Sequence, residues 1–321
     1  MEQRVLGRTG LRVSVLGYGA GAVGGLMVRG TPAEQERSVG TALDAGVTYV
    51  DTAPAYGNGE SERNLGRVLK ALSASPVLGT KVRLPAGTRG DIAGAIAASL
   101  EASLARLGRE SVDLFQLHDP VGGAEGLTLA QVLEEAVPAM QRLQAAGKCR
   151  FLGITALGEV AALQALFAEG VIDTAQVPFN ALNPSWLGVL PAGLPGQDFE
   201  GLGVAAAAQG VGLIGIRILA AGALSGEAAR HPTAMPEVAP IASAADYATD
   251  VANARRLAPL VAEGEAASLA ELAIRFALSA PLIGTALIGT ASQAQLEVAL
   301  AAAAKGPLPG PVLERVAALM A

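Results

Sequence analysis

Cysteine is almost absent from this chain, and that absence limits both its chemistry and its location. Cys149 is the single cysteine, so no disulfide can form within the chain. The first residues also lack the basic-then-apolar pattern of a secretory leader. Proteins that stay in the reducing cytoplasm need neither disulfides nor a leader. The composition therefore predicts a cytoplasmic protein.

Excess positive charge and long apolar runs are lacking as well. The formal net charge is -6 and the pI is about 5.1, so no positive field gathers nucleic-acid phosphates or anionic lipids. The longest uncharged run, between Arg275 and Glu297, is interrupted by Pro281, Gly284 and Gly289. Neither nucleic acid nor a membrane is an expected partner, and no metal site is expected. We expect a small-molecule substrate and a monomer or homodimer.

What the chain does contain is a regular alternation of short apolar segments and helical patterns. The predicted strands are residues 15–17, 48–51, 77–81, 112–118, 151–154, 174–177, 212–216 and 285–288. The predicted helices are residues 32–45, 61–72, 92–107, 129–146, 160–167, 202–209, 266–279 and 293–304. Eight strand-helix pairs in strict order predict an α/β fold, the closed (β/α)₈ TIM barrel, with residues 1–321 as a single domain.

Two further segments complete the predicted barrel. Residues 4–14 are expected to form a β-hairpin around Gly7 and Gly10 that closes the bottom of the barrel. Long loops are expected at the opposite, C-terminal face. The longest covers roughly residues 219–250 and contains Pro232, Pro236 and Pro240. A loop of this length at that face is expected to lie beside the functional site.

One glycine motif invites a different interpretation. Gly19, Gly21 and Gly24 match the G-x-G-x-x-G fingerprint of Rossmann dinucleotide-binding domains. In that fingerprint a helix begins within the motif, but the first helix start here is at Thr31-Pro32. The acidic residue at the right spacing, Asp44, falls inside a helical pattern. We therefore interpret the three glycines as a loop over the barrel mouth.

Ionisable residues follow three successive predicted strands. Asp51, Lys81 and His118 stand at the strand ends, and Tyr56 lies in the loop after Asp51. Taken singly, an Asp at a strand end is usually a cap, and a Lys usually extends its ammonium to water. A barrel, however, brings the carboxyl ends of all its strands to one face. The convergence of four such groups there favours a catalytic site.

The chemistry of carbonyl reduction explains why these residue types would occur together. A carbonyl oxygen must receive a proton as hydride reaches its carbon, and a phenol releases its proton reluctantly near neutral pH. A neighbouring ammonium stabilises the phenolate, so Lys81 is expected to activate Tyr56 while Asp51 holds Lys81. His118 is expected to act as a neutral ring that hydrogen-bonds the substrate oxygen.

The sequence resembles the aldo-keto reductase superfamily from end to end. The segments that carry this resemblance are Leu6-Gly7-Arg8-Thr9-Gly10-Leu11, Val50-Asp51-Thr52-Ala53, Tyr56-Gly57, Ser61-Glu62, Thr80-Lys81, Leu117-His118-Asp119 and Gly153-Ile154-Thr155. By that resemblance Asp51, Tyr56, Lys81 and His118 take the family's catalytic roles. The resemblance also implies a nicotinamide cofactor that lies extended across the barrel mouth without a Rossmann unit.

The resemblance further implies where the cofactor would bind. The residues expected to contact it are Gly19, Thr155, Gln176, Arg217, Leu219, Gly289, Ser292 and Gln295. Gln176 falls on the family's glutamine for the nicotinamide amide, whereas Thr155-Ala156 replaces its usual Ser-Asn. After the seventh strand, where many members carry a stacking Tyr or a Ser-Pro-Leu, this chain has Ile216-Arg217-Ile218-Leu219. Arg217 is therefore expected to reach a cofactor phosphate.

The segment after the eighth strand indicates which cofactor is preferred. Family members that bind NADP usually carry Lys or Arg there, but residues 289–296 contain no cation. A ribose phosphate would lack its donors, whereas a free ribose hydroxyl could use Ser292 or Gln295. NAD is therefore expected to be preferred over NADP.

The chain is most similar to the branch of the family that contains L-galactose, L-fucose and D-threo-aldose 1-dehydrogenases, which oxidise a sugar at its anomeric carbon to a lactone. Tyr18, Asp119, Asn180 and Trp186 are the residues expected to contact such a substrate. Two enzymes of the same fold remain alternatives, a general NAD(P)H-dependent aldehyde or ketone reductase and a pyridoxal dehydrogenase. An alternative of another class is a non-catalytic barrel that only binds cofactor, like the channel-associated β subunits.

Overall fold

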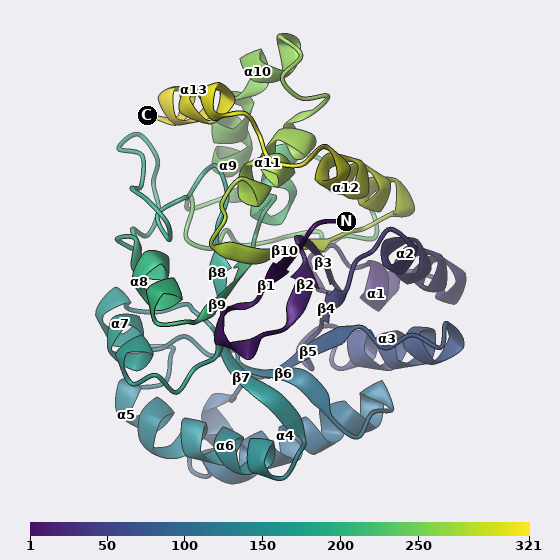
Figure 1. Ribbon diagram of the computed structural model, residues 1–321, viewed down its shortest axis with the longest axis vertical. Coiled ribbons are helices and arrows are strands. Elements are labelled where there is room, and N and C mark those ends of the chain that lie inside the picture. Colours follow the sequence, from purple (N-terminus) through teal and green to yellow (C-terminus); the bar gives the residue numbers. More distant parts are fainter.

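Eight parallel strands close into a barrel in the computed structural model, which describes residues 1–321 (Figure 1). Around the barrel the strand order is β10-β3-β4-β5-β6-β7-β8-β9. The strands are β3 (Leu16–Gly19), β4 (Tyr49–Asp51), β5 (Val77–Val82), β6 (Val112–Leu117), β7 (Cys149–Thr155), β8 (Thr174–Pro178), β9 (Gly212–Ile216) and β10 (Ile283–Gly289). This confirms the predicted (β/α)₈ barrel, and each strand begins and ends within two residues of its predicted bounds.

Helices surround the barrel and cover its outer face (Figure 1). Those predicted from the sequence are α2 (Pro32–Asp44), α3 (Glu60–Ala71), α4 (Ile92–Leu107), α5 (Leu129–Gln131) continued by α6 (Val137–Ala145), α7 (Val160–Ala168), α8 (Leu202–Ala208), α11 (Leu269–Leu278) and α12 (Gln293–Lys305). Their starts follow local side-chain chemistry. Thr31, for example, caps α2 by accepting a hydrogen bond from the Glu34 backbone, and the Glu34 carboxylate accepts one from the Thr31 backbone.

The helix predicted over residues 129–146 is not continuous. A π-helical turn, η3 (Val132–Ala136), separates α5 from α6. Pro138 has no backbone N–H to donate to the carbonyl four residues earlier, and the Val137 N–H reaches back to Val132 instead. A proline inside an otherwise helical pattern therefore changes the turn type here without ending the helix.

Several short elements were not expected from the sequence. They are the helices α1 (Leu26–Arg29), α9 (Tyr247–Arg255), α10 (Ala258–Ala262) and α13 (Gly310–Met320), and the 3₁₀ turns η1 (Gly7–Thr9), η2 (Ala86–Thr88) and η4 (Ala220–Ser225). Side chains of α9, α10, α11 and α13 form an apolar cluster of their own outside the barrel. None of the helices has both the length and the apolar character that crossing a bilayer would require.

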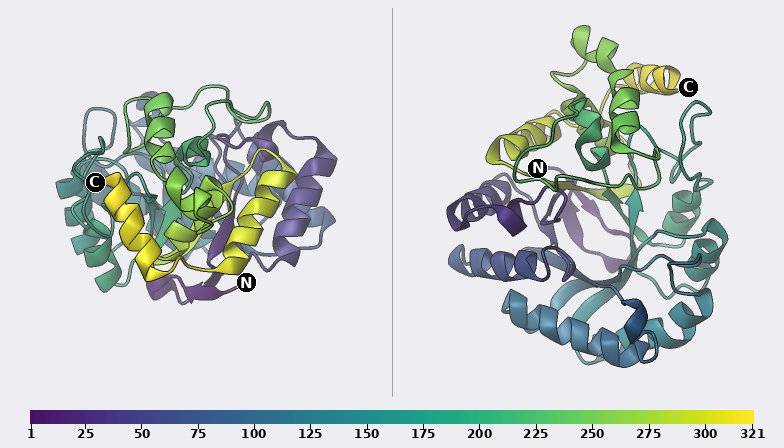
Figure 2. Two further views of the ribbon diagram at one scale, coloured as in Figure 1. Left: turned by 90° about the horizontal axis from the view of Figure 1, so that it is seen from above. Right: turned by 180° about the vertical axis from the view of Figure 1, so that it is seen from behind.

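The N-terminal hairpin plugs one end of the barrel. Strands β1 (Gln3–Val5) and β2 (Arg12–Ser14) pair antiparallel, as predicted. Leu6 lies so close to Gly212 and Gly284, where β9 and β10 begin, that a Cβ on Gly212 would stand 2.7 Å from the Leu6 side chain. The Arg4 guanidinium donates to three backbone carbonyls near the start of β10. Figure 2 shows the hairpin and the long loops at opposite ends of the molecule, which leaves the C-terminal face as the open mouth.

The glycine motif does not open a Rossmann helix. Gly19 ends β3, and the loop after it passes over the end of β10 before the single turn of α1. A Cβ on Gly24 would stand 2.6 Å from the Thr290 backbone oxygen, so this approach of two backbones requires glycine. The motif therefore forms part of the barrel mouth.

Candidate active site

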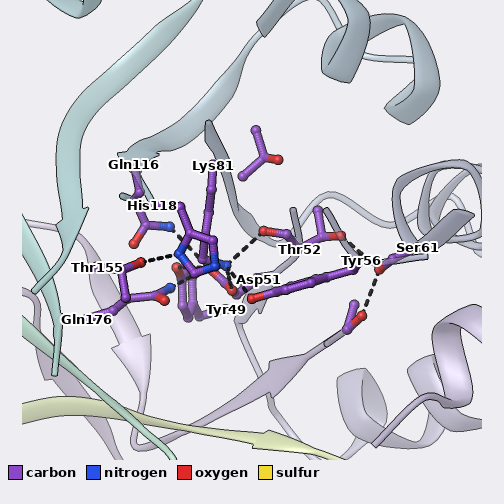
Figure 3. Close-up of polar contacts among 12 residues, drawn as sticks. Tyr49, Asp51, Thr52, Tyr56, Ser61, Lys81, Gln116, His118, Thr155 and Gln176 are labelled. Carbon is purple, nitrogen blue, oxygen red and sulfur yellow. Dashed lines mark hydrogen bonds and ion pairs between the residues drawn. The ribbon is translucent and has the colours of Figure 1, made fainter. Parts of the chain in front are cut away.

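The four ionisable residues singled out in the sequence meet at the barrel mouth. Asp51 ends β4, Lys81 lies near the end of β5, and His118 follows β6 directly. Tyr56 lies in the loop that connects β4 to α3. Because β4, β5 and β6 are neighbours in the parallel barrel, their carboxyl ends place these side chains together (Figure 3).

Lys81 connects the carboxylate to the phenol. Its ammonium is fully buried, forms an ion pair with Asp51 Oδ1, and donates to the Thr52 carbonyl oxygen at 2.9 Å. It also donates to the Tyr56 hydroxyl at 3.2 Å. Burial by itself lowers the pKa of Lys81, but Asp51 and Tyr56 outweigh it, so that pKa is raised above its usual value. Lys81 therefore stays charged beside the phenol.

Asp51 accepts three further hydrogen bonds from neutral side chains. They reach its second oxygen, Oδ2, from Tyr49 Oη at 3.0 Å, Gln116 Nε2 at 3.1 Å and Gln176 Nε2 at 2.7 Å. Burial and then the adjacent Asp51 charge raise the pKa of Tyr49 well above its usual value, which keeps this phenol protonated as a donor. A buried carboxylate is tolerated when its oxygens are satisfied in this way.

Tyr49 and Gln116 are site residues that sequence reasoning missed. Tyr49 lies two residues before Asp51 on the same strand, so both side chains point to the same side of the sheet. Gln116 pairs with Lys81 in the register of β5 and β6. The two-residue period of a strand could have indicated Tyr49, whereas Gln116 required the register between strands.

His118 is held by Thr155 at the end of the neighbouring strand. Its Nδ1 lies 2.6 Å from Thr155 Oγ1, and its ring meets that of Tyr56 edge to face with centroids 6.3 Å apart. Burial, with the nearby charges of Lys81 and Arg83, lowers the pKa of His118 to about 3. The imidazole is therefore neutral near pH 7, in agreement with the neutral ring expected from the sequence.

A cavity of about 870 Å³ opens over these residues. Asp51, Tyr56 and His118 contribute to its wall. Of the residues expected to contact a cofactor, those that line it are Gly19, Thr155, Gln176, Arg217, Leu219, Gly289 and Gln295. The long loop after β9 also lines it, through Arg230, His231 and Tyr247 among others. The loop of residues 219–250 thus lies beside the site, as predicted.

Ser292 was expected to contact the cofactor, but the structure gives it another role. Its side chain caps α12 by accepting a hydrogen bond from the Gln295 backbone, and it does not line the cavity. Gln295 does line it, and its Oε1 accepts from the Ala291 N–H at 2.8 Å. The amide nitrogen of Gln295 is left to donate.

Two aromatic residues expected to contact substrate lie elsewhere. The Tyr18 side chain is buried, and its hydroxyl pairs with Ser38 of α2 at 3.0 Å, on the outer side of the barrel wall. Trp186 is fully buried and stacks on Phe199 with ring centroids 4.7 Å apart. Neither lines the cavity, so packing explains both residues.

Two polar residues expected to contact substrate instead form hydrogen bonds with the protein backbone. Asp119 is buried and accepts from the Leu84 N–H at 2.8 Å. The Asn180 amide donates to the Arg217 carbonyl oxygen at 2.8 Å, and its own oxygen accepts from the backbone of its loop. Arg217 has a φ of +57°, unusual for a residue with a side chain. Asn180 thus supports a cavity residue but does not line the cavity itself.

Together, the groups at the barrel mouth are arranged so that they can perform acid-base chemistry on an oxygen atom. The phenol can give or take a proton, the ammonium stabilises its anion, and the neutral imidazole can bind the reacting oxygen. The model of the Aldo/keto reductase family matches residues 15–321, and the chain belongs to that family. The family expected from the sequence motifs is thus confirmed. The protein is an oxidoreductase of a family that uses nicotinamide cofactors.

Two relatives with assigned activities and one solved structure are similar to this chain. L-galactose dehydrogenase of Arabidopsis thaliana is 30% identical over 314 residues, 94% of this chain and 88% of that protein. D-threo-aldose 1-dehydrogenase of a Pseudomonas species is 34% identical over 170 residues, 45% of this chain and 50% of that protein. An aldo-keto reductase from Bacillus halodurans in its holo form shares the fold with a TM-score of 0.74 at 24% identity, covering 100% of this chain and 97% of that one.

Proposed function

We propose that this protein oxidises an aldose at C1 to the lactone, with NAD as the preferred cofactor and Tyr56 as the acid-base residue. The observation that carries the proposal is the position of Lys81, whose ammonium bridges the Asp51 carboxylate and the Tyr56 hydroxyl at the cavity wall. The names of the two relatives, an L-galactose dehydrogenase and a D-threo-aldose 1-dehydrogenase, support an aldose as the substrate. We take residues 1–321 to act as one catalytic domain.

Each residue of the site has a defined task in this reaction. A bound nicotinamide supplies a hydride to the carbonyl carbon, or accepts one from the carbinol carbon. In the oxidative direction Tyr56 takes the hydroxyl proton, and Lys81 stabilises the phenolate that does so. Asp51 keeps the ammonium of Lys81 in place. His118, as a neutral ring, hydrogen-bonds the reacting oxygen and orients it.

The residues of the cavity fit a dinucleotide. A cavity of about 870 Å³ is within the range of ligand sites, roughly 300–1,000 Å³. Gln176 gives its amide nitrogen to Asp51, so its Oε1 remains to accept from the nicotinamide amide. Arg217 lines the same cavity, and its guanidinium makes one long hydrogen bond, 3.4 Å to the Ala239 carbonyl oxygen, which leaves donors for a cofactor phosphate. Gly19 and Gly289 bring two backbones together at the wall.

The preference for NAD follows from the wall formed by β10 and α12. The lining residues from this segment are Gly289, Thr290, Ala291, Ala294, Gln295 and Val298, and none is a cation. A ribose phosphate there would lack the charged donors that it needs. Gln295 instead offers an amide nitrogen to a ribose hydroxyl.

A second candidate is the reduction of a simple aldehyde, which the apolar lining favours. Leu157 and Ile216 lie in the cavity wall with Tyr56 and His118, and the polar residues expected to recognise sugar hydroxyls lie outside it. Aldose oxidation therefore rests on the relatives and on the site chemistry. A panel of aldoses and simple aldehydes, followed in both directions by nicotinamide absorbance, separates the two candidates. Reduction of aldehydes without oxidation of any aldose would select the second.

The acid-base assignment is tested by Tyr56→Phe. Loss of the hydroxyl is expected to lower turnover by about 10²- to 10⁴-fold and to leave cofactor affinity unchanged. Turnover is measured at saturating cofactor, and cofactor affinity by fluorescence titration. A variant that keeps near-normal turnover would overturn the assignment. Specificity constants that favour NADP would reject the cofactor preference alone.

A further inference from the structure

Thr155 was expected to contact the cofactor, but its hydroxyl lies against the catalytic imidazole. Thr155 ends β7 and His118 follows β6, and the two strands are paired up to Leu117 and Ile154. This register brings Thr155 Oγ1 to 2.6 Å from His118 Nδ1 (Figure 3). We propose that Thr155 is a positioning residue that donates its proton to Nδ1 and so fixes the His118 tautomer with hydrogen on Nε2.

Which of the two groups donates follows from the hydrogen-bond partners that each of them has. A neutral imidazole carries one donor and one acceptor, so only one of its nitrogens bears hydrogen. Thr155 is buried, and its hydroxyl makes no other hydrogen bond in the structure. If Nδ1 donated to it, the hydroxyl proton would find no acceptor among the protein groups around it, which is costly for a buried hydroxyl. If the hydroxyl donates, both groups are satisfied.

The neutral state that this argument needs has an independent cause. Burial and the charges of Lys81 and Arg83 lower the pKa of His118 to about 3, so the ring does not gain a second proton near pH 7. With Nδ1 turned to Thr155, Nε2 is the nitrogen left for the cavity that His118 lines. The substrate oxygen therefore meets an N–H donor.

This arrangement decides which of two residues, His118 or Tyr56, can accept the proton of the substrate hydroxyl. An imidazole whose Nε2 already carries hydrogen cannot take the proton of the substrate hydroxyl. It can only donate a hydrogen bond to that oxygen, which serves both a carbinol and a carbonyl. Proton transfer is then left to Tyr56, beside Lys81. The kinetic part of this inference rests on the proposed function, whereas the tautomer itself can be tested without substrate.

The tautomer can be read directly, because the chain has only two histidines, His118 and His231. In protein labelled with ¹⁵N at histidine, a protonated and an unprotonated ring nitrogen give well separated resonances. His231→Gln assigns the two sets of signals. We expect the wild-type His118 to show an unprotonated Nδ1 and a protonated Nε2. A protonated Nδ1 in the wild-type protein would overturn the inference.

Thr155→Val then removes the donor while keeping the shape of the side chain. We expect the His118 nitrogen signals to shift and kcat to fall by about three- to tenfold, the worth of one neutral hydrogen bond. Cofactor affinity should not change in this variant. If Thr155 instead contacted the cofactor amide, losing that contact would raise the dissociation constant of the cofactor. Thr155→Ser, which keeps the hydroxyl, should restore both kcat and the signals.

The matched control is Thr285→Val. Thr285 is also a buried strand threonine, but its hydroxyl has no hydrogen-bond partner, so His118 should retain its wild-type signals. Unchanged signals and unchanged kcat in Thr155→Val would overturn the inference. If Thr155→Val does not fold, the wild-type tautomer and the Thr155→Ser variant still decide it. Wild-type signals as expected, with no turnover on any substrate, would count against the proposed function alone.

Discussion

Tyr49 donates a hydrogen bond of 3.0 Å to Asp51 Oδ2, from two residues earlier on the same strand. The same oxygen also accepts from two glutamine amides, and the other oxygen holds the Lys81 ammonium. Both oxygens of the carboxylate thus have hydrogen-bond partners at the barrel mouth. Because the donors on Oδ2 are all neutral, the negative charge of the Asp51 carboxylate is balanced by Lys81 alone. Lys81 in turn contacts the phenol of Tyr56.

Tyr49→Phe tests this support of the ion pair. The variant keeps the ring and removes one donor to a buried charge, so we expect a loss of about 1.5–3 kcal/mol of unfolding free energy and a lower kcat. Chemical denaturation and steady-state kinetics measure the two effects. Tyr18→Phe is the matched control, because Tyr18 is equally buried but its hydroxyl pairs with Ser38 outside the barrel. A fall in kcat of similar size in both variants would contradict the specific role of Tyr49.

Gly79→Ala tests whether the space around Asp51 is required. A Cβ on Gly79 would stand 2.6 Å from Tyr49 Oη and 3.2 Å from Asp51 Oδ2. Overpacking of this kind costs about 1–3 kcal/mol, and here it would also displace the donors of the carboxylate. We expect a lower melting temperature together with a reduced kcat. Gly90→Ala, where a new Cβ meets nothing within 4 Å, should change neither, and equal effects at both positions would refute the argument.

The position of a residue at the end of a strand can be read from a sequence, which explains why the ionisable residues of the site could be predicted. Asp51, Lys81 and His118 each follow an apolar segment, and a parallel barrel brings such ends together whatever the details of packing. Tyr49 and Gln116 lie within strands rather than at strand ends. Tyr49 shares a side of the sheet with Asp51 through the two-residue period of one strand, whereas the contact of Gln116 with Asp51 depends on the register of neighbouring strands and on the close approach at Gly79.

The direction of a loop side chain could not be predicted in the same way. Trp186 and Asn180 follow β8, so their sequence positions are compatible with a substrate contact. The structure turns Trp186 against Phe199 and uses the Asn180 amide to hold the Arg217 carbonyl. A side chain near the mouth either faces the cavity or supports a loop, and only the folded loop decides which.

Gln295→Arg tests the origin of the proposed cofactor preference. Gln295 is exposed at the start of α12 and lines the cavity on the wall that has no cation. A guanidinium there would offer charged, paired donors to a ribose phosphate. We expect the ratio of kcat/KM for NADP to that for NAD to rise by about tenfold or more, as one charged hydrogen bond is worth roughly 1.5–3 kcal/mol. An unchanged ratio would mean that the ribose binds elsewhere.

The low pKa of His118 predicts how stability depends on pH. Burial first, and then Lys81 and Arg83, lower that pKa from 6.5 to about 3 in the folded state. Between these values the unfolded chain binds one more proton than the folded chain, so stability falls as pH is lowered below 6.5. From about pH 7 to about pH 5 this one group removes about 2 kcal/mol of unfolding free energy. Denaturant unfolding at the two pH values measures the loss.

His118→Gln removes the titrating group, so the difference in unfolding free energy between the two pH values should shrink by that amount. His231→Gln replaces the other histidine, which is exposed, and should keep the wild-type difference. If His118→Gln and the wild-type protein lost the same free energy on acidification, the His118 imidazole would have to be charged in the folded protein at pH 5. A charged ring would have both nitrogens protonated, and Thr155 could then no longer donate to Nδ1.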